Sequence, residues 1–244
     1  MTKRIAVFGG SGGNGSAIAK LASKDAKVTI GYRSNKERAE ATAKEIRDSR
    51  GDAQISEVDI CDGESVSHFY STVQEHWGGI DGIVSATGPA FLLTPITEIN
   101  DDEFRNVIEA DVIGSFNILK RGIPFLKKSG GGSIVLLLTT AVLRTLEEDA
   151  LSMVPKKAVE GLIKTAALEY GEDGIRLNGV APGSIDRHSI HFQVGRKRSR
   201  VASQTPLGRK GKPSEVAELA AFLLSDAASY ISGQIIGVDG GFSA

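Results

Sequence analysis

Short apolar runs alternate with longer amphipathic stretches from one end of this 244-residue chain to the other, and this alternation constrains the fold most. Short apolar runs predict strands over residues 4–8, 27–31, 53–58, 82–85, 133–138, 176–180 and 234–238. Amphipathic periodicity predicts helices over 16–21, 36–49, 63–77, 102–127, 151–170 and 214–224. Such strands, joined by helices, are typical of a parallel sheet covered on both faces. We therefore expect one α/β domain over 1–244: a doubly wound, seven-stranded parallel sheet with a ligand crevice beyond the carboxyl ends of its strands.

The composition places the chain among soluble globular proteins, with 41% hydrophobic and 24% charged residues. A net charge of −1 gives no electrostatic reason to expect nucleic acid or an anionic membrane as a partner. The longest apolar run, residues 134–138, is too short to span a bilayer, and the first apolar run is too short for a signal peptide. Cys61 has no second cysteine to pair with, which favours a reducing compartment, so a cytoplasmic location is expected.

A glycine-rich run, Gly9-Gly10-Ser11-Gly12-Gly13-Asn14-Gly15, directly follows the first predicted strand and leads into a helix. Glycines at 9, 13 and 15 let the backbone turn tightly and approach a pyrophosphate closely. The unpaired N–H groups of the following helix and its partial positive charge suit phosphate oxygens. We predict that Gly9, Ser11, Gly13, Asn14 and Gly15 bind a dinucleotide.

The residues after the second and third strands indicate which dinucleotide is bound. A carboxylate at the end of the second strand would bind the ribose diol of NAD and repel a 2′-phosphate. This chain has Arg33 and Ser34 there, and the guanidinium of Arg33 matches a 2′-phosphate. This favours NADP over NAD, the alternative being that Arg33 is simply an exposed loop residue. Asp59 and Ile60 are placed to meet the adenine ring, although Asp59 could equally cap the helix that begins near residue 63.

A segment of weak periodicity, residues 183–212, interrupts the alternation and is predicted to be a substrate-covering loop. Its basic cluster is interpreted as a solvated face of that loop, with a nucleic-acid patch as the weaker alternative. Two histidines without carboxylate or cysteine companions at ligand spacing predict no metal site. The residues concerned are His188, His191, Arg196, Lys197, Arg198 and Arg200.

Several further motifs have the spacing of one protein family. These motifs are the glycines at 9, 13 and 15, the block 156–162 that begins Lys156-Lys157-Ala158, and the turn Ala181-Pro182-Gly183. The segments 206–209, 222–225 and 238–241 belong to the same set of motifs. On these motifs the chain resembles the short-chain dehydrogenase/reductase family over nearly its whole length. The resemblance implies a Rossmann fold that binds NAD(P), a small-molecule substrate, and homotetramers or homodimers built on the long helices and the last strand. It also implies that the cofactor contacts Ala86, Thr87, Gly88, Lys156, Pro182, Gly183 and Ile185.

The positions that handle protons in this family carry other residues here. The tyrosine of the family's Tyr-x-x-x-Lys motif is replaced by Ser152, while Lys156 is kept. The substrate-orienting serine corresponds to Thr139, the helix asparagine to Asp111, and the threonine after the Pro-Gly turn to Arg187. By resemblance, Ser152, Thr139, Asp111 and Lys156 form the catalytic set.

The replacement of tyrosine by serine changes the chemistry. Hydride addition to a carbonyl creates an alkoxide that must be protonated, and a nearby ammonium can lower a tyrosine pKa from about 10 so that the phenol serves as the acid. An aliphatic hydroxyl is far less acidic. Thr139 could still bind a substrate oxygen, and Asp111 could pair with Lys156, the alternative being that it simply faces solvent. The loop acids 147–149 could supply a proton, although an exposed, helix-capping loop is the favoured interpretation, and His188 and His191 are weaker candidates.

These features predict an NADPH-dependent oxidoreductase with an atypical active site that reduces an enoyl thioester or a carbonyl. Reduction of a conjugated C=C places charge on an enolate, which is less basic than an alkoxide and which hydroxyl donors can stabilise. The alternative is a catalytically inactive nucleotide-binding sensor or regulatory subunit, because several proton-handling positions have changed together.

Overall fold

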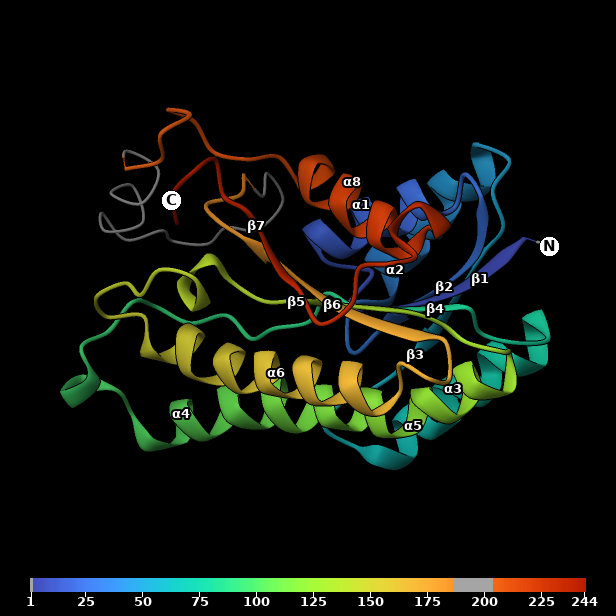
Figure 1. Ribbon diagram of the computed structural model, residues 1–244, viewed down its shortest axis with the longest axis horizontal. Coiled ribbons are helices and arrows are strands. Elements are labelled where there is room, and N and C mark those ends of the chain that lie inside the picture. Colours follow the sequence, from blue (N-terminus) through green and yellow to red (C-terminus); the bar gives the residue numbers. More distant parts are fainter. Residues whose placement is uncertain (1, 187–203) are drawn as a thin grey trace.

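The computed structural model describes residues 2–186 and 204–244, and its centre is a single parallel sheet (Figure 1). The strands are β1 (Lys3–Phe8), β2 (Ala26–Tyr32), β3 (Ala53–Glu57), β4 (Gly82–Ser85), β5 (Gly132–Leu137), β6 (Ile175–Pro182) and β7 (Ile235–Val238). They pair in the order β3-β2-β1-β4-β5-β6-β7, each parallel to its neighbours. The seven-stranded doubly wound sheet is thereby confirmed. The strand order reverses between β1 and β4, where such folds open a crevice.

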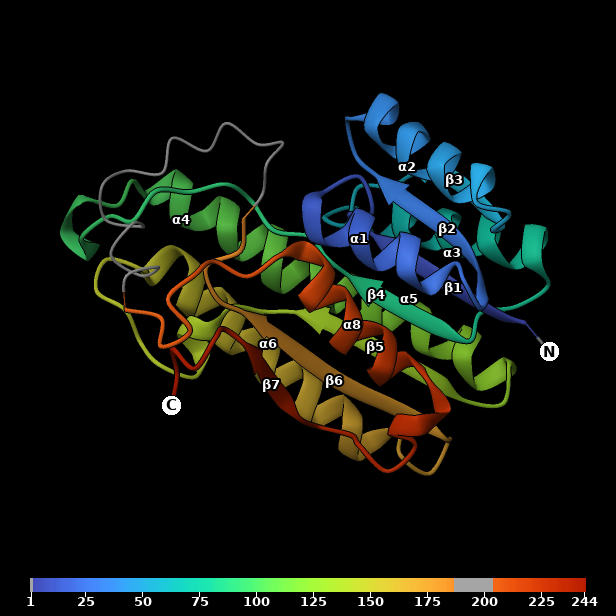
Figure 2. The ribbon, with the colours of Figure 1, turned by 90° about the horizontal axis from the view of Figure 1, so that it is seen from above.

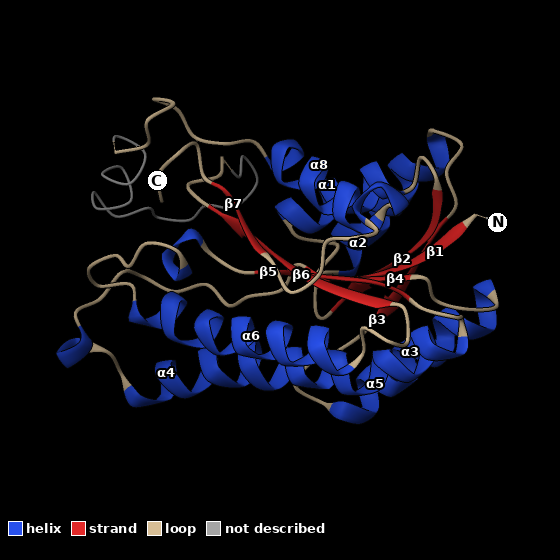
Figure 3. Ribbon diagram, in the orientation of Figure 1, coloured by secondary structure: helices blue, strands red, loops and turns tan. Residues whose placement is uncertain are grey.

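Helices cover both faces of the sheet (Figures 1 and 3). One face carries α1 (Gly13–Ala22), α2 (Lys36–Asp48) and α8 (Pro213–Leu224), and the other carries α3 (Gly63–Trp77), α4 (Asp101–Ile108), α5 (Gly114–Lys128) and α6 (Ala150–Glu169). Seen from above, α1 and α8 lie side by side over the sheet (Figure 2).

Two cores sandwich the strands because successive side chains point to opposite faces. In β1, Ile5 and Val7 pack beneath α1, α2 and α8, whereas Ala6 and Phe8 pack against α3 and α5. These four residues are at most 4% exposed, so β1 is buried on both faces. This burial explains why the strand is apolar throughout rather than alternating.

The long helix expected over 102–127 is interrupted. A π-helical turn, Glu109–Ile113, separates α4 from α5 and contains the buried Asp111. Because the residues on each side of this turn have helical periodicity, the sequence pattern predicts one continuous helix here. Single π turns inside helices are frequent at functional sites.

The described ends of the predicted covering loop lie side by side at the carboxyl end of the sheet. Ile185 and Gly211 form a parallel bridge, in which Asp186 N donates to Gly211 O at 2.8 Å and Gly211 N donates to Ser184 O at 2.9 Å. The predictions about Arg187, His188, His191 and the basic cluster fall outside the described residues. Of the helices in 2–186 and 204–244, none has both the length and the apolar character needed to cross a bilayer.

Candidate active site

A cavity of about 400 Å³ lies beyond the carboxyl ends of the central strands. It is bordered by the start of α1, the residues after β4, the π-helical turn, the ends of β5 and β6, and the first turns of α6. Apolar side chains line part of it, among them Phe91, Leu93 and Leu146. The predicted site residues that the fold gathers here are Asn14, Ala86, Thr87, Gly88, Asp111, Thr139, Ser152, Lys156, Pro182, Gly183 and Ile185.

Lys156 is held inside this cavity by a carboxylate. Its Nζ lies 2.9 Å from Asp111 Oδ1, with side chains only 11% and 2% exposed, and it also donates to Thr87 O at 3.3 Å. The next residue, Lys157, has a half-exposed side chain, pairs with the buried Glu160 and donates to Val142 O at 3.2 Å. The predicted pairing of Asp111 with Lys156 is therefore present, and the alternative of a solvent-facing Asp111 is wrong.

One face of α6 presents three polar residues to the cavity. Asp149 is the N-cap residue, Ser152 follows three positions later and Lys156 four after that, a spacing that places them on one side of a helix. These residues are 5%, 7% and 8% exposed, and all three line the cavity. Ser152 therefore faces the cavity on the same side of α6 as Lys156.

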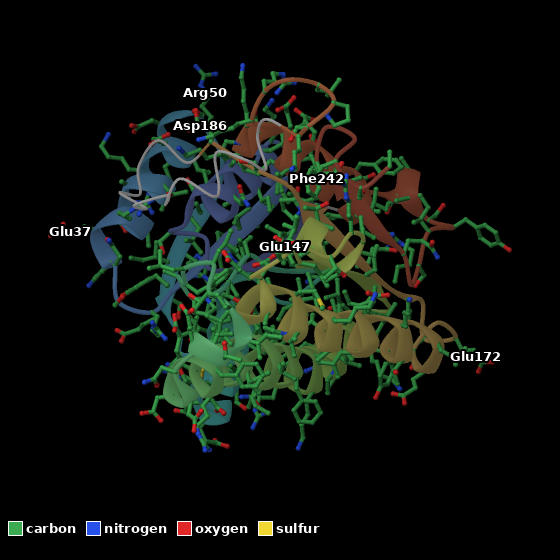
Figure 4. All side chains as sticks on the ribbon, turned by 90° about the vertical axis from the view of Figure 1, so that its left-hand side faces the viewer. Glu37, Arg50, Glu147, Glu172, Asp186 and Phe242 are labelled. Carbon is green, nitrogen blue, oxygen red and sulfur yellow. The ribbon has the colours of Figure 1, made fainter. Side chains whose placement is uncertain are left out.

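The expected exposed, helix-capping loop is wrong for Asp149. Its side chain makes no capping hydrogen bond; instead its carbonyl oxygen accepts from Ser152 N at 3.1 Å and Met153 N at 2.8 Å. Glu147, two residues earlier, is exposed, and Figure 4 labels it on the loop before α6. The sequence does not distinguish the three consecutive acids 147–149. The path of the backbone decides which of them faces the cavity.

Two hydrogen bonds, one within the loop and one to the C-terminal segment, hold the threonine hydroxyls after β5 in place. Thr139 Oγ1 accepts from Ala141 N at 3.3 Å at the start of a 3₁₀ turn, Thr140–Val142, while its side chain still lines the cavity. Thr140 donates to Asp239 Oδ2 at 2.6 Å and thereby ties this loop to the C-terminal segment. Burial alone would raise the pKa of Asp239, but hydrogen bonds from Ser243 and Thr140 hold it below its usual value. No local pattern in the sequence indicates this contact between Thr140 and Asp239.

The glycine loop is shaped for close approach of a ligand. Gly9 has φ +72°, and a Cβ there would lie 2.8 Å from Ala86 O. Gly12 precedes α1 with no side-chain cap, which leaves the first helical N–H groups available. Asn14 is only 6% exposed, and no described residue hydrogen-bonds to its Oδ1. An orphaned buried polar atom beside a free helix N-terminus fits a nucleotide bound across this loop.

Of the other predicted cofactor residues, several do not line the cavity. Arg33 and Ser34 are exposed after β2, and Ile60 is buried after β3. Asp59 Oδ1 accepts from Cys61 N at 3.0 Å, whereas α3 is capped by Asp62. The alternative that Asp59 caps this helix is therefore wrong. Gly9, Ser11, Gly13 and Gly15 belong to the glycine loop and its junction with α1.

The ends of β2 and β3 share one electrostatic environment. Burial, together with the Asp59 and Glu109 carboxylates, raises the pKa of Cys61 to about 11, while the guanidinium of Arg33 acts in the opposite direction. Arg33 therefore lies near enough to the β3–α3 loop to influence it. Both lie at the carboxyl edge of the sheet, next to the N-terminus of α1.

Comparison with known proteins identifies the family. A family model described as enoyl-(acyl carrier protein) reductase matches residues 11–243. A short-chain type dehydrogenase/reductase from Mycobacterium ulcerans superposes with a TM-score of 0.93 at 30% identity, covering 99% of this chain and 90% of that one. The chain belongs to the short-chain dehydrogenase/reductase family.

Two other members of the short-chain dehydrogenase/reductase family show which reactions such proteins perform. The cis-4-hydroxycyclohexanecarboxylate dehydrogenase of Sinomonas cyclohexanicum is 34% identical over 244 residues, which is 99% of this chain and 97% of that protein. A 7α-hydroxysteroid dehydrogenase solved with NADH and a 7-oxo bile acid has a TM-score of 0.91 at 28% identity, covering 98% of this chain and 93% of that one. Members of this family are oxidoreductases that use nicotinamide cofactors.

Within this short-chain dehydrogenase/reductase scaffold, the described lining of the cavity includes hydroxyls, the ammonium groups of Lys156 and Lys210, and carboxyls, but no tyrosine, histidine or cysteine. The hydroxyls and ammonium groups can donate hydrogen bonds to a polarised oxygen. Carboxyl groups can also exchange a proton near neutral pH when their surroundings suit.

Proposed function

We propose that this protein is an NADPH-dependent reductase that acts on a carbonyl or an enoyl thioester without a tyrosine acid. The observation that supports it most is the buried Lys156–Asp111 ion pair, which holds an ammonium group in the cavity. The glycine loop before α1, whose backbone suits a bound nucleotide, borders the same cavity. In the proposed complex, Lys156 donates to the hydroxyls of the nicotinamide ribose. Arg33 and Ser34 bind the 2′-phosphate, and Asp59 and Ile60 contact the adenine.

Each polar group in the cavity then has a defined task. When bound, NADPH supplies the hydride. Thr139 and Ser152 offer O–H donors to the oxygen on which negative charge develops, and donors already fixed in place stabilise such charge best. The Lys156 ammonium has its own carboxylate partner at 2.9 Å, so it serves to orient the cofactor rather than to activate an acid at position 152.

A second candidate, a nucleotide-binding sensor or regulatory subunit without turnover, is favoured by one observation. The described cavity lining lacks the side chains that most often transfer protons in enzymes, apart from carboxyls. This candidate uses the same cofactor site and differs only in lacking a substrate reaction.

Two measurements test the proposal. NADPH binding is followed by fluorescence for the wild type, for Lys156→Met, and for Lys157→Met as a matched control on the outer side of α6. We expect Lys156→Met alone to weaken binding by about tenfold or more, the effect of losing charged hydrogen bonds. NADPH oxidation is then measured with 4-oxocyclohexanecarboxylate, a 3-oxobutanoyl thioester and a crotonyl thioester. Turnover of any of these supports the reductase, tight binding without turnover supports the sensor, and no binding of either coenzyme contradicts both.

We also propose that the protein is a homodimer or homotetramer of cytoplasmic location. Apolar side chains are exposed along the outer helices, including Phe104 on α4, Phe116 on α5 and Leu168 on α6, and a second group includes Phe222 on α8. Pairing of copies through these helices would remove this surface from water. Light scattering behind a size-exclusion column measures the mass, and a monomer at micromolar concentration would contradict the assembly.

A further inference from the structure

We propose that Asp239 is a positioning residue for the reaction, whose carboxylate holds the loop after β5 so that the Thr139 hydroxyl faces the substrate oxygen. This inference rests on the proposed reductase function, in which Thr139 is one of the donors to that oxygen. Asp239 itself does not line the cavity. It acts through Thr140, which is its hydrogen-bond partner and the residue next to Thr139.

The Asp239 carboxylate directly follows β7 and accepts three hydrogen bonds. Oδ2 accepts from the Thr140 hydroxyl at 2.6 Å and from Ser243 N at 3.1 Å, and Oδ1 accepts from Gly241 N at 3.0 Å. Both oxygens are therefore needed as acceptors. Burial raises the pKa of Asp239, but these donors outweigh burial and hold the pKa below its usual value, so the group is ionised at neutral pH. An ionised acceptor makes the bond from Thr140 stronger than a bond between neutral groups.

The C-terminal segment that begins at Asp239 holds the loop after β5 at two points. Thr140, at the start of the 3₁₀ turn, bonds to Asp239, and Arg144, just after the turn, donates to Phe242 O at 2.7 Å. The Arg144 guanidinium also lies 4.8 Å from the centroid of the Phe242 ring, which is 1% exposed and is labelled in Figure 4. Thr139 immediately precedes the turn, so the direction of its side chain depends on both attachments.

Asp239 also packs against the turn after β6, which borders the same cavity. Gly183 N donates to Val238 O at 3.0 Å, and a Cβ on Gly183 would lie 2.8 Å from both Cα and Cβ of Asp239. Gly183 and Thr139 both line the cavity. Asp239 therefore lies between the loops that follow β5 and β6 and fixes one relative to the other. The contact with Gly183 involves only Cα and Cβ, which an asparagine at this position would keep.

These contacts give the two adjacent threonine hydroxyls different roles. Thr140 is 3% exposed and donates its hydroxyl hydrogen to Asp239, so that hydrogen is not offered to a substrate. The Thr139 hydroxyl accepts from Ala141 N at 3.3 Å, which leaves its own hydrogen for donation to a ligand in the cavity. Donors stabilise developing charge best when they are held in place, and a misplacement of about 1 Å can lower a rate by about 100-fold. Holding Thr139 in place is thus the task of Asp239.

The test uses full-length variants and the best of the three acceptors above, with rates expressed per NADPH-binding site so that unfolded protein does not count. Asp239→Asn replaces one acceptor oxygen by an N–H donor and should lower kcat by about 10- to 100-fold, with KM and the Kd for NADPH nearly unchanged. Thr140→Val should have the same effect, whereas Thr140→Ser keeps the donor and should restore most of the rate.

Asp81→Asn is the matched control for a loss of stability. The Asp81 carboxylate also accepts several hydrogen bonds, all from Arg4, but it precedes β4 at the opposite edge of the sheet from the cavity. Asp81→Asn should therefore lower the melting temperature and leave kcat unchanged. A drop in kcat as large as that of Asp239→Asn would show that general destabilisation, and not the position of Thr139, sets the rate, and would overturn the proposal.

A double variant shows whether Asp239 acts through Thr139. Thr139→Val removes the donor itself, so adding Asp239→Asn in that background should lower kcat no further. An equal drop in kcat in both backgrounds, or a wild-type kcat in Asp239→Asn alone, would overturn the proposal.

Hydrogen exchange provides a readout that does not require turnover. Peptides that cover residues 139–144 should exchange faster in Asp239→Asn and Thr140→Val than in wild type, and at the wild-type rate in Asp81→Asn. Unchanged exchange in the first two variants would overturn the proposal. Failure of the reductase function itself looks different, because wild type then oxidises NADPH with none of the three acceptors, and the exchange rates alone decide whether Asp239 holds the loop.

Discussion

Asp111 and Lys156 come from different helical segments and place opposite charges 2.9 Å apart, almost sealed from water. Asp111 lies in the π-helical turn, and Lys156 lies in the second turn of α6. The pair joins the π-helical turn to α6 at the wall of the cavity, within the helical layer on one face of the sheet. A buried ion pair of this kind contributes little net stability when intact, but loss of one partner leaves an uncompensated buried charge.

The first prediction concerns that pair. Asp111→Ala should lower the free energy of unfolding by about 3–5 kcal/mol, because Lys156 then remains buried without its carboxylate. Urea unfolding followed by circular dichroism measures the loss. Lys157→Met removes one of two lysines that pair with Glu160, and since Lys164 stays 2.6 Å from that carboxylate the change in stability should be smaller, about 1 kcal/mol. A double variant, Asp111→Ala with Lys156→Met, should recover part of the loss, and no recovery would argue against the pairing as its cause.

A second prediction concerns the glycine loop. Gly9→Ala should lower stability and weaken NADPH binding, because the residue has φ +72° and the new Cβ would lie 2.8 Å from Ala86 O. The matched control is Gly161→Ala in α6, where a Cβ meets nothing within 4 Å. That change should stabilise the protein by up to about 1 kcal/mol through helix propensity. Equal melting temperatures for the two variants would contradict the steric argument.

Coenzyme choice provides a third prediction. Arg33→Ala should raise the Kd for NADPH by about tenfold or more and leave that for NADH nearly unchanged, because only NADPH carries the 2′-phosphate that a guanidinium would bind. Lys36→Ala, at the exposed start of α2, provides a nearby loss of positive charge as the control. Parallel weakening of both coenzymes in Arg33→Ala would show that the arginine acts on something other than the 2′-phosphate.

The fourth prediction concerns Cys61, whose pKa is raised to about 11 by burial and by the nearby carboxylates. Only the thiolate is alkylated, so a raised pKa lowers reactivity at neutral pH. At pH 8 the folded protein should react with iodoacetamide roughly 100-fold more slowly than an ordinary thiol, and the rate should climb until about pH 11. The same protein in urea is the reference, and an inflection near pH 8.5 in the folded state would contradict the environment described here.

Local pattern was sufficient for most of the scaffold. The strands could be located because burial on both faces makes them apolar throughout, as in β1, and the glycine loop because only glycine tolerates the backbone at Gly9. The predicted Asp111–Lys156 contact came from resemblance rather than from spacing, since 45 residues separate the two. The sequence pattern did not predict the burial of Asp149, because the residues before it are also acidic. It did not predict the π-helical turn, because the segments on both sides of that turn are helical.

The sequence by itself determined the parallel sheet, the helices on both faces and the presence of Ser152 four residues before Lys156, because periodicity and residue identity are local properties of the chain. Only the tertiary structure decided that Lys156 is neutralised by Asp111 and that Asp149, rather than Glu147, turns into the cavity. Those outcomes depend on how α6, the π-helical turn and the loop before α6 pack together, since burial and ion pairing arise between segments that are distant in sequence.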